Sequence, residues 1–203
     1  MYDETTIEFL TEGGMGILPT DTLYGLVTTA LDPDAVERVY SIKQRNPSKP
    51  LIVLISDLEQ VEQFGIVLDD ALIEQLTSYW PACAELVAAG RPGPYSIVLP
   101  TVDDQYEYLS RGSDSIAFRL PDNEELRELI RVVGPLVAPS ANPEGYPPAT
   151  TLEEAQKYFG SDVDFYVDGG TLDGKPSTLI RIENGEVEEI GRASCRERVL
   201  ASV

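Results

Sequence analysis

Segments with the apolar pattern of buried strands alternate along this chain with segments whose apolar residues recur at helical spacing. The segment PLIVLIS, residues 50–56, is apolar almost throughout, which is typical of a strand covered on both faces of a sheet. The segment at 32–45 opens with Asp-Pro and places Val36, Val39 and Tyr40 on one face, which is typical of an amphipathic helix. This alternation predicts an α/β domain.

The same patterns divide the rest of the chain into short elements. We expect helices at 5–14, 32–45, 57–65, 69–80, 123–133 and 152–160, and strands at 15–19, 50–56, 95–100, 115–121, 135–140 and 164–170. The segment 177–190 predicts a β-hairpin whose turn is Asn184-Gly185. We therefore expect one α/β (α+β) domain with a twisted, mixed, open sheet flanked by helices.

Two segments interrupt this pattern. Residues 82–91 are rich in alanine and lie between two proline-containing motifs, so we interpret them as an insertion. Residues 191–203 do not continue the hairpin and resemble the translation of a sequencing adapter, so we interpret them as a non-native tail. The expected domain is therefore 1–190. Both cysteines, Cys83 and Cys195, fall in the two interrupting segments, and we assign them no function.

Composition and charge narrow the possible functions. The chain has 203 residues, which is enough for one domain, and no apolar run long enough to cross a bilayer. Because its start lacks a basic region and a cleavage site, we expect a cytoplasmic protein. The net charge of −20 repels nucleic acid unless basic residues are concentrated locally. The chain has no histidine, which excludes a Cys/His metal site and a Ser-His or Cys-His catalytic pair.

One short stretch concentrates positive charge: it contains Lys43, Arg45 and Lys49, and a stiff Asn-Pro-Ser turn lies between the last two. Convergent lysine and arginine side chains on a rigid turn are suited to neutralise a polyphosphate. The residues alone fit equally well the C-terminal capping of a solvated helix. Both interpretations remain open at this point.

Polar residues also follow several predicted strands. Ser140 and Asn142 begin a proline-rich loop that ends at Thr150, at a position where open α/β sheets commonly expose ligand-binding groups. Arg119 ends another strand, and Ser177 begins the first strand of the hairpin. Each of these residues also fits an ordinary turn or, for Arg119, a surface ion pair.

The order of these motifs resembles that of one known family. PTDTLYGL at 19–26 is followed by K-x-R, K-P-L-I-V, W-P, P-G-P-Y-S-I-V-L-P, R-L-P, P-S-A-N and P-S-T. The series is similar to the YrdC/TsaC family of L-threonylcarbamoyladenylate synthases, and the similarity runs over about residues 7–190. The resemblance implies a single domain with a positively charged central cavity. It also implies a nucleotidyltransferase that forms threonylcarbamoyl-AMP and pyrophosphate from L-threonine, bicarbonate and ATP with Mg²⁺. A downstream threonylcarbamoyl-transferase complex would then modify tRNA (t6A).

The resemblance also assigns roles to individual residues. The cations that bind the triphosphate are Lys43, Arg45 and Lys49, of which Lys43 and Arg45 are expected to be catalytic. The residues that hold the nucleotide elsewhere are Ser115, Asn142 and Thr150. The residues that contact L-threonine are Thr22, Arg119, Ser140 and Ser177, and the planar fork of the arginine suits a carboxylate. Magnesium is expected on the ATP phosphates rather than at a protein site.

Three features depart from the family pattern. Leu54 stands where some relatives have a histidine that contacts threonine. The Trp-Pro and Pro-Gly-Pro motifs, which are contiguous in the family, are separated here by residues 82–91. The arginine that follows the last hairpin in the family would be Arg192, which lies in the suspected tail, and we give it no role. An alternative function is a non-catalytic module of the same fold that binds double-stranded RNA or a nucleotide, although the charge of −20 argues against strong RNA affinity.

Overall fold

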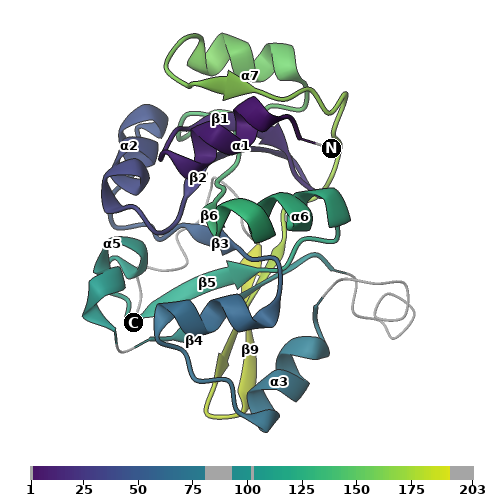
Figure 1. Cartoon of the computed structure of the whole chain (residues 1–203). Coiled ribbons are helices and arrows are strands. Elements are labelled where there is room, and N and C mark those ends of the chain that lie inside the picture. The colour runs from purple at the N-terminus through teal and green to yellow at the C-terminus, as the bar shows by residue number, and fades with distance from the viewer. Residues whose placement is uncertain (1, 81–92, 102, 193–203) are drawn as a thin grey trace.

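Nine strands form one sheet in the order β7-β1-β2-β6-β3-β5-β4-β8-β9, with helices packed against it (Figure 1). The computed structural model describes residues 2–80, 93–101 and 103–192. The strands are β1 (Gly16–Pro19), β2 (Tyr24–Thr29), β3 (Ile52–Leu54), β4 (Tyr95–Pro100), β5 (Ser115–Arg119), β6 (Leu136–Val137), β7 (Phe165–Tyr166), β8 (Thr178–Glu183) and β9 (Glu186–Arg192). The α-helices are α1 (Glu4–Thr11), α2 (Pro33–Lys43), α3 (Asp70–Thr77), α5 (Glu107–Ser110), α6 (Glu124–Val133) and α7 (Leu152–Phe159), and the 3₁₀ helices are η1 (Leu58–Phe64) and η2 (Asp104–Tyr106).

The sheet is mixed. The pairs β1–β7, β3–β5 and β4–β8 are parallel, and the other five neighbouring pairs are antiparallel. The last antiparallel pair is the expected hairpin, and its turn residues Asn184 and Gly185 have φ angles of 52° and 80°, as a type I′ turn requires. The prediction of a mixed, open α/β sheet flanked by helices is therefore confirmed.

The period-two alternation of the strands divides their side chains between two faces of the sheet. On one face, Ile17, Leu26 and Val53 join a large core cluster that also contains buried residues of α2, η1, α3 and α7. On the other face, Leu18 and Leu54 pack with the buried residues of α1 and α6. Each face of the sheet is therefore packed against a different set of helices.

Among the described residues, helices cover only part of the second face. Farther along it, Val98, Ala117 and Leu179 form a separate small cluster that includes only strand residues, with Ile52 and Ile190 packed against it. Strand alternation and the register of β3, β4, β5 and β8 place these side chains on the same side of the sheet as Leu54. The part of this face outside the α1–α6 cluster is where the candidate site lies.

The position at which α2 ends determines where the basic stretch lies. The Asp32 side chain caps its N-terminus by accepting a hydrogen bond of 2.9 Å from the backbone N–H of Asp34. The helix ends at Lys43, and Gln44 takes a left-handed conformation with a φ of 51°. The chain then reverses through 46–49 and enters β3, so the cations of this stretch lie at the end of a helix, as the sequence predicted.

Several boundaries differ from the prediction. No strand was predicted between 20 and 49, but Tyr24–Thr29 form β2. The helix expected at 57–65 is the 3₁₀ helix η1, and neither η2 nor α5 was predicted. Strand β9 runs on to Arg192, past the domain end expected at 190, and pairs Arg192 with Thr178. The proposed insertion at 82–91 and the rest of the proposed tail, 193–203, lie outside the described residues.

None of the helices in the described part of the chain has the length and apolar character that crossing a bilayer needs.

Candidate functional site

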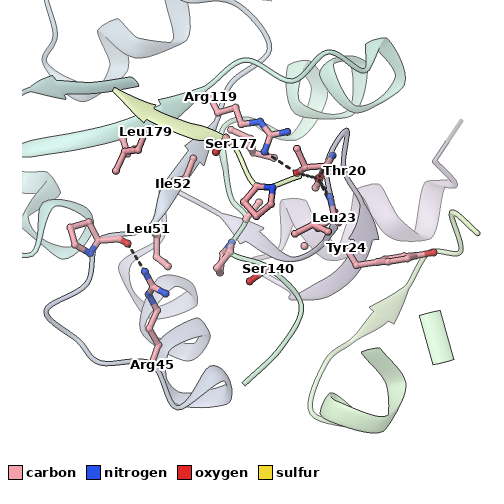
Figure 2. Close-up of a pocket in the computed structure, with 18 residues that line it drawn as sticks. Thr20, Leu23, Tyr24, Arg45, Leu51, Ile52, Arg119, Ser140, Ser177 and Leu179 are labelled. Atoms are coloured by element: carbon pink, nitrogen blue, oxygen red, sulfur yellow. Dashed lines mark hydrogen bonds between the residues drawn. The ribbon is translucent and has the colours of Figure 1, made fainter. Parts of the chain in front are cut away.

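A pocket opens on the second face of the sheet, beside the cluster of Val98, Ala117 and Leu179. Its floor consists of strand side chains, and its walls come from the β1–β2 turn, the segment after α2, the segment after β6 and the segment before β8. Figure 2 shows two cationic side chains, Arg119 and Arg45, on opposite sides of this pocket, with Ser140 between them. The lining contains no acidic residue. The pocket therefore has two separate positively charged ends.

The β1–β2 turn forms one wall through a compact set of hydrogen bonds around Thr20. The Thr20 hydroxyl donates to the carbonyl of Leu23 at 2.7 Å and accepts from the backbone N–H groups of Thr22 and Leu23 at 3.1 and 3.2 Å. Its oxygen also lies 3.0 Å from the hydroxyl oxygen of Thr22. Thr20 belongs to the motif PTDTLYGL, and the sequence predicted no role for it, although its hydroxyl organises the whole turn.

These contacts determine which way the hydroxyl of Thr22 points. Thr20 has a single hydroxyl proton, which it donates to the carbonyl of Leu23. In the hydrogen bond between the two threonine hydroxyls, Thr22 must therefore be the donor and Thr20 the acceptor. The Thr22 oxygen also accepts a hydrogen bond of 3.0 Å from Nη1 of Arg119. Thr22 therefore has only a lone pair left to offer, and it presents the pocket with a hydrogen-bond acceptor.

Arg119 forms the base of this end of the pocket. It is the last residue of β5, opposite Leu54 of β3, and its carbonyl accepts a hydrogen bond of 3.0 Å from the N–H of Ile55. Its guanidinium is buried, donating through Nη1 to Thr22 and through Nη2 to the carboxylate of Asp21. Its Nε–H is buried and has no hydrogen-bond partner in the described part of the chain. The strand end thus places a buried cation beside a pocket whose lining, among the described residues, has no acidic side chain.

Two serines complete the wall near this end. Ser177 precedes β8, and its buried hydroxyl lies 2.8 Å from that of Ser96 on the neighbouring strand β4. The hydroxyl of Ser140 donates to the side-chain oxygen of Asn142 at 2.6 Å. Asn142 in turn donates to two backbone carbonyls of its own loop, at 2.9 and 2.8 Å. Asn142 therefore shapes the loop that presents Ser140.

The basic end is arranged differently, because its cations already bind protein acceptors. Lys43 is buried, and its ammonium donates to the carbonyls of Ser140 and Asn142, the second at 2.6 Å. The Arg45 guanidinium donates to the carbonyls of Lys49 and Pro50 at 3.3 and 2.9 Å, the latter contact shown in Figure 2.

Lys49 forms an ion pair with Glu144, whose other carboxylate oxygen accepts from the N–H of Asn46 at 2.6 Å. Burial alone would raise the pKa of Glu144, but the hydrogen bonds from Lys49 and Asn46 and the nearby positive charges outweigh it and lower the pKa below its usual value. Glu144 thus joins the basic stretch to the loop that follows β6.

The structure brings half of the predicted site residues to one pocket. The predicted residues that line it are Thr22, Arg45, Arg119, Ser140 and Ser177. The predicted residues that do not line it are Lys43, Lys49, Ser115, Asn142 and Thr150. Of these, Ser115 is the first residue of β5, with its hydroxyl 3.2 Å from that of Ser113, and Thr150 donates to Glu154 at 3.0 Å. Leu54, which stands in place of a histidine found in some relatives, also lines the pocket.

A further contact places the segment before β8 directly on the β1–β2 turn. The Tyr24 hydroxyl donates to the carbonyl of Gly170 at 2.8 Å and accepts from the N–H of Gly169 at 2.8 Å. Burial raises the pKa of Tyr24, so the phenol stays protonated. Gly174 lies so close to Thr22 that a Cβ there would come within 2.0 Å of the Thr22 carbonyl oxygen, and a larger residue would push this wall aside.

The chain resembles known proteins over most of its length. The family model Sua5_yciO_yrdC, described as "Telomere recombination", matches residues 8–194. The threonylcarbamoyl-AMP synthase of Pseudomonas paraeruginosa is 34% identical over 178 residues, which cover 87% of this chain and 90% of that protein.

Solved structures support the same relationship. The crystal structure of Pyrococcus abyssi Sua5 complexed with L-threonine superposes with a TM-score of 0.78 at 30% identity, covering 91% of this chain and 52% of that one. This chain thus spans about half the length of that Sua5 protein. Escherichia coli YciO, at 22% identity and a TM-score of 0.74, shares the fold. Because the family model and the Pseudomonas relative both match most of its length, the chain belongs to the Sua5/YciO/YrdC family.

Proposed function

We propose that this protein is an L-threonylcarbamoyladenylate synthase, an enzyme that forms threonylcarbamoyl-AMP and pyrophosphate from L-threonine, bicarbonate and ATP. The observation that carries the proposal is the two-ended pocket. At one end the buried guanidinium of Arg119 lies beside a hydroxyl oriented as an acceptor, and at the other end lies Arg45, a member of the basic stretch. An amino acid and a triphosphate need these two environments. The curated relatives that carry the name threonylcarbamoyl-AMP synthase support this assignment.

The Arg119 end suits L-threonine. The guanidinium would bind the α-carboxylate through the second N–H of its terminal nitrogens, each of which already donates one hydrogen bond within the protein. Thr22, as an acceptor, would take a hydrogen bond from the amine or the side-chain hydroxyl of the substrate. Ser140 and Ser177 border the same space and would supply further contacts. Leu54 would leave the substrate without the imidazole contact that some relatives have.

The Arg45 end suits the triphosphate. Arg45 and Lys49 would neutralise the phosphate oxygens, with Lys49 exchanging Glu144 for phosphate. Lys43 would act through the field of its buried charge and by holding the carbonyls of Ser140 and Asn142 in place. Ser115, Asn142 and Thr150 remain our proposed nucleotide contacts, and Mg²⁺ would arrive as part of the nucleotide substrate.

The reaction needs charge stabilisation rather than a nucleophilic side chain. The amine of threonine and bicarbonate give a carbamate and water, and a carbamate oxygen then attacks the α-phosphorus of ATP. As the new P–O bond forms, the bond to the β-phosphate oxygen breaks, and pyrophosphate leaves with the electron pair. Negative charge builds on the phosphoryl oxygens and on the leaving group, so cations placed beside them lower the barrier. Arg45 and Lys43 are the residues that we propose for this role.

The product would be handed to a threonylcarbamoyl-transferase complex that modifies adenosine in tRNA. The product is a mixed anhydride of a carbamate and a phosphate, and its carbonyl carbon is the electrophile that such a transferase needs. Because tRNA is the final acceptor, we propose the cytoplasm as the site of both steps.

The test is pyrophosphate release from Mg·ATP, measured with and without L-threonine and with and without bicarbonate. We expect release only when both co-substrates are present. Release that is independent of L-threonine would contradict the proposal. Salt-sensitive binding of double-stranded RNA without pyrophosphate release would instead support a non-catalytic binding module.

A further inference from the structure

A buried ion pair lies at the amino-acid end of the pocket, and only one of its partners lines the pocket. The side chains of Arg119 and Asp21 are each 8% exposed, and Nη2 of the arginine donates to Oδ1 of the aspartate. The other oxygen of Asp21 accepts from the backbone N–H of Asp122 at 3.2 Å. Arg119 lines the pocket and Asp21 does not. A carboxylate in the pocket would therefore contact Arg119 but not Asp21.

The pair explains how the protein tolerates a buried cation in an empty pocket. A guanidinium removed from water without a counter-ion is strongly destabilising, and breaking a buried pair leaves such a charge behind. Here Asp21 supplies the opposite charge and Thr22 a neutral acceptor, so both terminal nitrogens have a partner. Only the buried Nε–H has no partner among the residues that the structure describes. The guanidinium is thus held in one orientation before any ligand arrives.

We propose that Asp21 is a positioning residue that acts as the resident counter-ion of Arg119, and that it limits the affinity of the pocket for the amino-acid carboxylate. This inference rests on the proposed function, in which that carboxylate binds Arg119. A substrate carboxylate meets a guanidinium whose charge Asp21 already balances, so the gain on binding is smaller than at an unpaired arginine.

The limit on affinity has a use in the catalytic cycle. Threonylcarbamoyl-AMP retains the same α-carboxylate, so every interaction that strengthens threonine binding also holds the product. Tight binding of substrate and product alike would slow release without speeding the chemical step. A built-in counter-ion keeps Arg119 in position for recognition and still allows the product to leave.

The variant that removes the charge with the least change in shape is Asp21→Asn: the amide oxygen can still accept from Nη2, while the negative charge and the hydrogen bond from the N–H of Asp122 are lost. In thermal unfolding without ligand, we expect its Tm to fall by about 5–10 °C, since Arg119 loses its counter-ion. In calorimetric titration with L-threonine, we expect its Kd to fall on the order of tenfold relative to the unmodified protein. A purely structural role would give the loss of stability without the gain in affinity.

Two controls sharpen the test. L-Threoninamide keeps the ammonium but lacks the carboxylate, so Asp21→Asn should not bind it more tightly than the unmodified protein does. Asp164→Asn breaks the Arg38–Asp164 ion pair, which is outside the pocket lining, and should lower Tm without changing the Kd for L-threonine. Unchanged or weaker threonine binding by Asp21→Asn would overturn the inference, and so would an equal gain for threoninamide. If the unmodified protein binds no L-threonine at all, the proposed function itself fails.

A measurement on the unmodified protein covers the case in which Asp21→Asn does not fold. In ¹H–¹⁵N NMR spectra of the arginine side chains, a guanidinium held at both terminal nitrogens rotates slowly and gives separate Nη signals. We expect such signals for Arg119 in the ligand-free protein, with the Nε–H signal shifting when L-threonine is added. Fast rotation in the ligand-free protein would overturn the inference.

Discussion

The two ends of the pocket differ in how far they are ready for a ligand. At the Arg119 end, the turn from Thr20 to Leu23 orients its donors and acceptors, and one buried Nε–H has no partner within the described ranges. At the Arg45 end, Lys43 and Arg45 donate to backbone carbonyls, and Lys49 pairs with Glu144. The first end is preformed, and the second must exchange protein contacts for ligand contacts.

The difference implies different costs of binding. A preformed subsite loses little conformational entropy when its ligand arrives, whereas a cation that leaves an acceptor must regain that interaction from the ligand. The amino-acid end should therefore recognise its ligand with little movement. The nucleotide end should tighten only when a strongly charged ligand replaces Glu144 and the carbonyls. The predictions below test this contrast, beginning with the largest effect.

The largest effect is expected on stability, from Lys43→Met. Methionine fills similar space but leaves the buried carbonyls of Ser140 and Asn142 without their charged donor. Each lost hydrogen bond to a charged group costs about 1.5–3 kcal/mol, so we expect unfolding in urea to show a loss of about 4 kcal/mol. The exposed Lys157→Met on α7 is the control and should change stability by less than about 0.5 kcal/mol. A small loss for Lys43→Met would mean that this lysine is available to a ligand rather than committed to the loop.

The next effect is expected on catalysis, from Arg119→Lys. Lysine keeps the positive charge but loses the planar fork that contacts Thr22 and Asp21 together, so the substitution is not conservative here. We expect kcat/KM for L-threonine to fall about 100-fold, which is about 2.7 kcal/mol, in the pyrophosphate assay. The Kd for ATP should change less than about twofold, because the nucleotide binds at the other end. Arg38→Lys, outside the pocket lining, is the matched control. Equal losses for threonine and ATP would argue against two separate ends.

The fold was predictable where one segment carries its own signal. The apolar run around β3 and the Asn184-Gly185 turn of the hairpin both identify their elements locally. Strand β2 was missed because its first residues, Tyr24 and Gly25, belong to a motif with turn-like composition, and the strand is evident only from its pairing with β1. The order of strands in the sheet depends on such long-range pairing, which no local pattern contains.

The site was predictable to the extent that its residues end strands or follow them. Arg119 and Ser140 were found in this way, and both line the pocket. The sequence did not identify the acidic residues that pair with the cations of the site. Asp21 is 98 residues from Arg119, and Glu144 is 95 residues from Lys49, so only the folded sheet brings each pair together. Acidic residues are common in this chain, and their sequence positions do not show which of them meet a cation.

A smaller catalytic effect is expected from Arg45→Ala. This arginine is the only one of the three basic-stretch cations that lines the pocket, so it should contact phosphate directly. We expect the Kd for Mg·ATP, measured by titration calorimetry, to rise about tenfold, while the Kd for L-threonine changes less than about twofold. Lys175→Ala is the control, because Lys175 does not line the pocket. If turnover and ATP affinity equal those of the unmodified protein, Arg45 does not bind the triphosphate.

The smallest effect is expected from Glu144→Gln. The direction of the change in the Kd for Mg·ATP shows whether Glu144 competes with the nucleotide for Lys49 or helps to bind the nucleotide. The substitution removes the charge that pairs with Lys49, so at pH 7 we expect a loss of stability of about 0.5–1 kcal/mol in urea unfolding. Lys49 is then free to bind phosphate, so the Kd for Mg·ATP should fall about threefold. Weaker ATP binding by this variant would mean that Glu144 contributes to the nucleotide site instead of masking it.

The pH dependence of the same pair provides an independent measure. The pKa of Glu144 in the folded protein is lowered from its ordinary value of 4.5, so the carboxylate stabilises the fold above that value. As pH falls through the lowered pKa, the folded protein takes up the proton and this contribution disappears. The stability difference between Glu144→Gln and the unmodified protein should therefore be constant from pH 6 to 8 and disappear in acid, once the pH is below the lowered pKa of Glu144. A difference that persisted in acid would show that the contacts of Glu144 act through shape and not through charge, and the nucleotide end would then be as preformed as the amino-acid end.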